Sequence, residues 1–360
     1  MPDEDTPTNE DVDGYEQQNL ELGAFPIDSL MIRSENRTVF EVARRIKNKQ
    51  YIMDPDFQRD FVWDASRQSK LIESALLRIP LPVFYLAEIP DGRIVVVDGL
   101  QRLTTFFRFL EGDFKLRGLE FAKELNGKKF DGLSPALQNR IEDTQLQLYL
   151  IDSQVPETAK YEIFERVNSG IPLTRQQMRN CLFVGRATEW LGQMSRSSEF
   201  LTATGESLNT KTMRDRECIN RFLAFQTFGW LNYSGKMDDF LGETLAQLNK
   251  SGAFDILTEA FRKSMQLNYR VQGAHAFRKS LADPGARTVL NVALFDVLSC
   301  VFTAANPAKV ESNALNIKAA IQNLINHELF NDAISRSTNS VRNVRLRFEM
   351  TEAALTPLIK

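Results

Sequence analysis

Residues 93–105, RIVVVDGLQRLTT, contain an abrupt change of hydrophobic pattern. The β-branched run at 94–97 is typical of a buried strand. Apolar residues then recur at helical spacing from Leu100 to Leu110. The sequence therefore predicts a strand and a helix joined by the turn Asp98-Gly99.

This turn has the chemistry of an anion site. Free backbone N–H groups and the positive end of the helix dipole favour negative charge at a helix N-terminus, and Gly99 lets a ligand approach the backbone. Asp98 can hold a divalent metal or act as a base. Arg102 can bind a phosphate through its guanidinium fork, and Thr104 and Thr105 add hydroxyls. The alternative is that Asp98 only caps the helix.

The neighbouring sequence predicts a mixed α/β region. Residues 83–87 should form a strand that pairs with 94–97 through a turn at 90–92. Helices are predicted from the capping boxes at Thr38 and Thr174, from Asp64 and from Pro135, and over 157–167, whereas alternation at 145–151 predicts a half-buried strand.

Strand signals fade after about residue 183. Helices are predicted at 214–230, 240–249, 253–267, 286–304 and 315–327. The expected class is α+β, with an acidic tail at 1–24, an α/β domain at 25–182 and a helical domain at 183–360.

Charge is unevenly spread along the 360 residues. The net charge is −3, but residues 1–32 hold nine acids and no Lys or Arg, so the rest carries −3 + 9 = +6. A mildly basic body fits an anionic ligand. The tail has few apolar residues to bury, which predicts disorder over 1–24.

Several classes of protein are poorly supported. His275 and His327 are the only histidines and lie far apart, which disfavours zinc sites and His-based catalysis. The sequence has no P-loop and no Rossmann fingerprint. Three scattered cysteines and no signal peptide favour the cytoplasm. The apolar stretch 289–305 contains Asn291 and Asp296, so a buried helix is expected there and no membrane span.

Five stretches together resemble a known prokaryotic family. Residues 98–105 resemble its Asp-Gly-Gln-Gln-Arg motif, with Leu100 in place of the first Gln, and supporting blocks lie at 57–63, 71–82, 163–170 and 214–217 with 342–347. The family supplies the N-terminal domain of GmrSD-type restriction enzymes and of SspE-like defence proteins. The resemblance implies a ParB/sulfiredoxin-like fold followed by helices, and no C-terminal His-Asn-His nuclease is expected here.

The resemblance also implies a function. The expected activity is that of an NTPase, a Mg²⁺-dependent NTP-hydrolysing module of anti-phage defence. Its catalytic residues would be Asp98, which also holds the metal, Gln101 and Arg102. The residues that would bind nucleotide or phosphate are Gln58, Arg59, Gly99, Thr104, Thr105, Arg166 and Asn168.

Alternatives stay open at this point. One is a ParB-like, metal-dependent DNA nickase that uses the same Asp98 site. Another is a non-catalytic module that senses nucleotide or DNA beside a partner defence protein, in an oligomer or alone. Arg342, Arg345 and Arg347 are candidates for contacting a nucleic-acid backbone, although a solvated helix face would also explain them.

Overall fold

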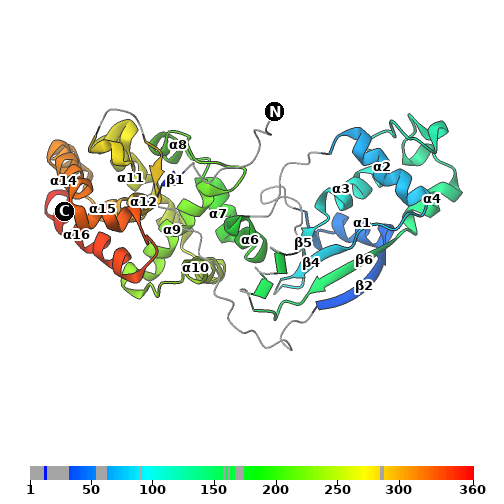
Figure 1. Cartoon of the computed structure of the whole chain (residues 1–360), viewed down its shortest axis with the longest axis horizontal. Coiled ribbons are helices and arrows are strands. Elements are labelled where there is room, and N and C mark those ends of the chain that lie inside the picture. Colours follow the sequence, from blue (N-terminus) through cyan, green and yellow to red (C-terminus); the bar gives the residue numbers. More distant parts are fainter. Residues whose placement is uncertain are drawn as a thin grey trace. The chain divides into compact units, whose positions relative to one another are not determined.

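The chain divides into two compact units. A computed structural model describes residues 12–13, 32–53, 63–89, 91–156, 159–160, 163–164, 166, 174–283 and 288–360. One unit spans Glu21–Leu182, and the other combines Met1–Leu20 with Phe183–Lys360. The first contains a five-stranded sheet with helices and the second is largely helical (Figure 1). The predicted α+β class with a helical C-terminal part is confirmed.

The sheet of the α/β unit is mixed, with strand order β2-β6-β4-β5-β3. Strand β2 pairs antiparallel with β6, β4 runs parallel to β6 and antiparallel to β5, and β5 is parallel to β3. The described elements are β2 (Ile32–Thr38), α1 (Val39–Lys47), β3 (Tyr51–Ile52), α2 (Ala65–Leu76), β4 (Phe84–Glu88), β5 (Ile94–Asp98), α3 (Leu100–Leu110), α4 (Pro135–Glu142), β6 (Gln145–Ile151) and α6 (Arg175–Leu182).

One face of this sheet is buried by helices. Leu86, Val96 and Leu148 project from three neighbouring strands into a single apolar core. Helices α1, α2 and α3 contribute to this core and lie on one side of the sheet (Figure 1). Because side chains alternate along a strand, the residues between these core positions face the other way.

Side-chain caps set the predicted helix starts. The hydroxyl of Thr38 accepts from the Glu41 N–H at 3.1 Å, and Asp64 accepts from the Arg67 N–H at 2.7 Å. The capping box at Thr174 is reciprocal, because Gln177 Oε1 accepts from the Thr174 N–H at 2.7 Å. These predicted starts are confirmed.

The second unit is built on helices and one short strand pair. Its elements are β1 (Val12–Asp13), α7 (Arg186–Met194), α8 (Ser198–Thr204), α9 (Arg214–Phe228), α10 (Met237–Ser251), α11 (Phe254–Gln272), β7 (Leu290–Asn291), α12 (Val292–Val301), α13 (Pro307–Ser312), α14 (Ala314–Asn326), α15 (Glu328–Ser335) and α16 (Val341–Ile359). The helix predicted at 286–304 is shorter than expected, because β7 precedes α12 and Asn291 caps it by accepting from the Leu294 N–H.

The predicted disorder is wrong at two residues of the acidic tail. Val12 and Asp13 form β1, which runs parallel to β7. The Asp13 carboxylate lies 2.6 Å from Lys279 Nζ and accepts from Asn291 Nδ2 at 3.0 Å. The other residues of 1–24 lie outside the described part of the chain. Within the described residues, no helix combines the length and apolarity needed to cross a bilayer.

Candidate functional site

A register shift between β4 and β5 places Asp98. Leu86 pairs with Val96, but Tyr85 pairs with Asp98, so Val97 is one extra residue on β5. Such a β-bulge bends its strand and redirects the following side chain, and bulges are common beside active sites. Asp98 is therefore the neighbour of Tyr85, and 37% of its side chain is exposed.

Gly99 is required by the backbone at this junction. Its φ is +100°, a value that favours glycine, and it is the N-cap of α3. A Cβ here would lie 2.3 Å from Cδ1 of Phe84, which is fully buried in the sheet core. The tight turn from strand to helix therefore depends on the missing side chain.

Gly99, the N-cap residue of α3, has no side chain to form a capping hydrogen bond, and the Asp98 carboxylate accepts from Arg102. The reading in which Asp98 serves only as a helix cap is therefore wrong. The first N–H groups of α3 keep their polarity, together with the positive end of the helix dipole. The Asp98 carboxylate therefore lies next to the N-terminus of α3.

The guanidinium of Arg102 is bound by other groups of the protein. Its Nη2 lies 2.7 Å from Asp98 Oδ2 and donates to Val83 O at 3.1 Å, while Nη1 donates to Pro82 O at 2.5 Å. The group also stacks 4.2 Å from the centre of the Phe84 ring. Only 12% of the side chain is exposed. The expectation that Arg102 offers an open fork to phosphate therefore needs correction, because its contacts hold Asp98 and the start of β4.

Burial lowers the pKa of Arg102 below its ordinary value, and Asp98 opposes that shift. An arginine starts so far above neutrality that the guanidinium stays charged. Asp98 therefore keeps a permanent cationic neighbour on Oδ2.

The two predicted threonines differ. Thr104 is half-buried. Thr105 is fully buried, and its hydroxyl donates to the Gln101 carbonyl at 2.7 Å. The prediction that Thr105 binds phosphate is therefore wrong, since its hydroxyl is used within the helix. Gln101 is half-buried one turn before it.

The remaining predicted ligand-binding residues are only partly described. Arg166 is described and exposed. Gln58, Arg59 and Asn168 lie outside the described residues. The structure therefore places Asp98, Gly99, Gln101 and Arg102 at one junction, with Thr104 further along α3. The assignments of Gln58, Arg59, Arg166 and Asn168 stay predictions.

Helix α6 adds polar residues that the sequence reasoning did not single out. Gln176, Arg179 and Asn180 are buried on this helix, which packs against β5. Arg179 Nε donates to Gln176 Oε1 at 3.0 Å, and Gln176 Nε2 donates to Asn180 Oδ1 at 2.9 Å. The sequence contained a sign of this polar cluster, because the helix that begins at the Thr174 capping box lacks an apolar stripe over residues 175–180. A helix of that composition needs polar partners if it is buried.

The described residues contain no group of three His, Cys, Asp or Glu side chains that could hold a metal ion. Asp98 is a single carboxylate with one oxygen, Oδ2, paired to Arg102. This donor set suits Mg²⁺ bound mainly through water and substrate phosphates, a common arrangement for that ion. It does not suit a metal held only by protein.

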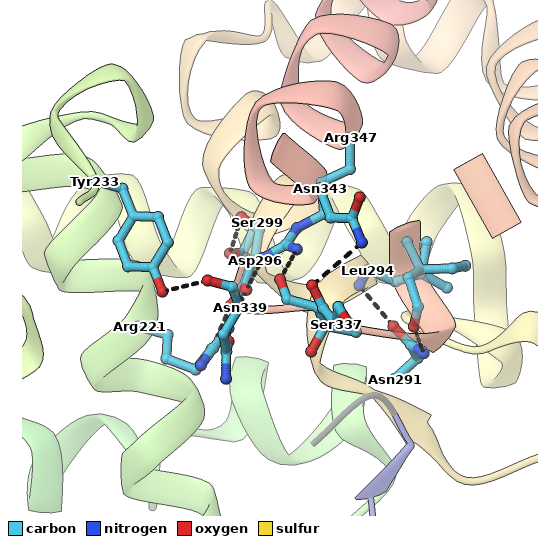
Figure 2. A network of polar contacts seen from close by, with 12 residues as sticks. Arg221, Tyr233, Asn291, Leu294, Asp296, Ser299, Ser337, Asn339, Asn343 and Arg347 are labelled. Atoms are coloured by element: carbon cyan, nitrogen blue, oxygen red, sulfur yellow. Dashed lines mark hydrogen bonds and ion pairs between the residues drawn. The ribbon is translucent and has the colours of Figure 1, made fainter. Parts of the chain in front are cut away.

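The three arginines predicted to contact nucleic acid differ in their exposure to solvent. Arg342 and Arg345 are exposed on α16. Arg347 is fully buried, so its assignment to a nucleic-acid surface is wrong. It belongs instead to a polar network inside the helical unit (Figure 2).

That network is centred on the buried carboxylate of Asp296. Arg221 donates to both of its oxygens, at 2.8 and 2.6 Å, and Arg347 donates to one of them at 2.9 Å. Arg221 also donates to Asn339, whose carbonyl accepts from the hydroxyl of Tyr233 (Figure 2). Helices α9, α12 and α16 are thereby joined through one carboxylate.

Comparison with known proteins finds a similarity for most of the first unit. Residues 39–184 match the family model of the GmrSD restriction endonuclease N-terminal domain, so this part of the chain is similar to that domain. The match contains the Asp98 junction and α6. No curated protein matches the chain.

Proposed function

We propose, from the similarity of residues 39–184 to the GmrSD restriction endonuclease N-terminal domain, that this protein is a Mg²⁺-dependent NTPase of a restriction-like defence system. One observation carries the proposal. A half-exposed carboxylate, Asp98, lies at a bulge beside a helix N-terminus without a side-chain cap. This arrangement pairs an anion-binding site with a potential base or metal ligand.

The N-terminus of α3 is the proposed phosphate site. Its first backbone N–H groups and the helix dipole favour negative charge, and Gly99 allows α3 to begin directly after Asp98. Thr104 and Gln101, on the first two turns of α3, are proposed to add polar contacts. The phosphate chain of a nucleotide would then end next to Asp98.

Asp98 is proposed to orient the attacking water and to hold Mg²⁺ through Oδ1. Bound Mg²⁺ would neutralise charge that develops on the phosphates. Arg102 acts as a positioning residue, since its bond to Oδ2 and its bonds to Pro82 and Val83 fix the carboxylate. Restricting that side chain keeps it in the geometry needed for reaction.

The test is phosphate release by the full-length protein with each of the four NTPs, with Mg²⁺ and with EDTA. At least one NTP should be hydrolysed in the presence of Mg²⁺. Asp98→Asn should lower turnover by about 10²- to 10⁴-fold, the range for removal of a positioned general base. Affinity for the NTP in EDTA should change little.

A matched control exists in the same hairpin. Asp91, at the other end of β5, also precedes a glycine and binds Arg93 at 2.7 Å. Asp91→Asn should hydrolyse NTP at the wild-type rate. Full phosphate release by Asp98→Asn would refute the mechanism. Nicking of supercoiled plasmid by the wild type without NTP hydrolysis would replace it with the nuclease alternative.

A further inference from the structure

Four side chains form a row across the sheet at the level of Asp98. Asp98 on β5 is the partner of Tyr85 on β4, Tyr85 is the partner of Tyr149 on β6, and Tyr149 is the partner of Ser34 on β2. Partners in neighbouring strands project on the same face. Because Leu86 and Leu148 enter the helix-covered core, Tyr85 and Tyr149 project from the opposite face. Asp98 lies beyond the bulge at the end of β5, where its carboxylate accepts from Arg102 of α3.

The two tyrosines of the row are stacked. Their ring centres are 5.5 Å apart with 25° between the planes. Both side chains are half-buried and neither belongs to a core cluster of buried apolar residues. Their rings therefore keep part of their area accessible on the face opposite the apolar core.

Packing between strands explains the stack only in part. Cross-strand aromatic pairs do stabilise sheets. However, buried tyrosines in this protein also use their hydroxyls, since that of Tyr51 accepts from Arg37 and that of Tyr233 donates to Asn339. The hydroxyls of Tyr85 and Tyr149 form no hydrogen bond in the described part of the chain. The pair thus presents aromatic surface with polar ends that remain available.

We infer that Tyr149 and Tyr85 form the platform on which the base of the nucleotide stacks. This inference rests on the proposed function and deepens it. Neighbouring strands are about 4.8 Å apart, so Tyr149 and Asp98 lie about 10 Å apart across two strand spacings. A nucleotide laid along the row would have its base at Tyr149 and its phosphates at Asp98 and the N-terminus of α3.

Stacking on the two tyrosines has a consequence for selectivity between bases. Every base has a π-face, so aromatic platforms bind bases without reading their edges. The platform is therefore expected to provide affinity for purine and pyrimidine nucleotides alike. Discrimination between bases would need polar groups, and Ser34 at the far end of the row is one that is exposed.

The test compares a ligand with a base and one without. Binding of NTP and of inorganic tripolyphosphate to the full-length chain is measured in EDTA by calorimetry. Tyr149→Leu should weaken NTP binding by roughly 5- to 140-fold, as expected for loss of one stacking contact. Tyr149→Phe should bind as the wild type does, because the ring is kept. Tyr269→Leu, at an exposed tyrosine of the helical unit, is the matched control.

Tripolyphosphate affinity should be the same in all four proteins. Equal NTP affinity of wild type and Tyr149→Leu, or equal affinity of the wild type for both ligands, would overturn the platform and leave the NTPase proposal standing. Failure of the wild type to bind either ligand would overturn both. If Tyr149→Leu does not fold, protection of the wild-type tyrosines from nitration is measured instead. NTP should protect Tyr85 and Tyr149 from tetranitromethane and tripolyphosphate should not, and equal protection by both would reject the platform.

Discussion

The protein contains two clusters in which an aspartate meets arginine, and their surroundings are opposite. In the α/β unit, Asp98 binds Arg102 with 37% of the acid's side chain exposed. In the helical unit, Asp296 binds Arg221 and Arg347 with none of the acid exposed. The first carboxylate has one oxygen available for other contacts, and the second has both oxygens bound by the protein.

The difference shows which cluster can do chemistry and which supports the fold. A buried charge costs several kcal/mol unless it is paired and hydrogen-bonded, so Asp296 must keep its partners. Two arginines around one carboxylate also leave an excess positive charge, and burial lowers the pKa of Arg347 to about 10. Asp98 carries no such constraint, because water reaches its side chain.

The largest expected effect is at the buried acid. Asp296→Asn should lower the free energy of unfolding by about 3–5 kcal/mol, since it leaves two arginines uncompensated in the interior. The measurement is urea unfolding followed by circular dichroism. Glu311→Gln is the control, because Glu311 pairs with Arg270 at the surface and such pairs contribute about 0–1 kcal/mol. Equal losses in both variants would remove the distinction between the clusters.

A third acid, Asp215, extends the comparison to the pH dependence of stability. Asp215 is buried on α9, and burial raises its pKa to about 6. The unfolded chain, with an ordinary pKa near 3.9, releases this proton earlier as pH rises. The wild type should therefore lose up to about 3 kcal/mol of stability relative to Asp215→Asn between about pH 4 and pH 7. Parallel stability curves of the two proteins across this range would contradict the raised pKa.

The smallest expected effect on stability is at the junction. Asp98→Asn removes one partly exposed ion pair with Arg102, which is worth less than about 1 kcal/mol. Thermal unfolding of this variant should nearly coincide with that of the wild type while its NTP turnover falls. A loss of stability as large as that of Asp296→Asn would show that Asp98 mainly supports the fold.

Local sequence was sufficient for the site's backbone. The β-branched run, the Asp-Gly pair and the helical spacing that follows predicted β5, the turn and α3, and the structure has all three. Caps at Thr38, Asp64 and Thr174 were also predictable, because each joins a side-chain oxygen to the backbone N–H three residues later. The match over residues 39–184 agrees with the resemblance drawn from the motif blocks.

Long-range relations were not accessible in the same way. Nothing near Arg347 in the sequence indicates that it meets Asp296, 51 residues away, so it looked like its exposed neighbours Arg342 and Arg345. The bulge at Val97 and the engagement of Arg102 by Pro82 and Val83 depend on how β4 pairs with β5. The row from Ser34 to Asp98 likewise exists only once four strands are in register.

The pairing of β1 with β7 has a consequence for synthesis. The hydrogen bond from Asn291 to Asp13 joins residues 278 positions apart, with the whole α/β unit between them. On the ribosome, Asp13 emerges early and can pair with Asn291 only after the whole α/β unit has been translated. Since domains tend to fold in the order in which they emerge, the α/β unit can mature alone. The acidic N-terminal strand would then be added to the helical unit as a late step.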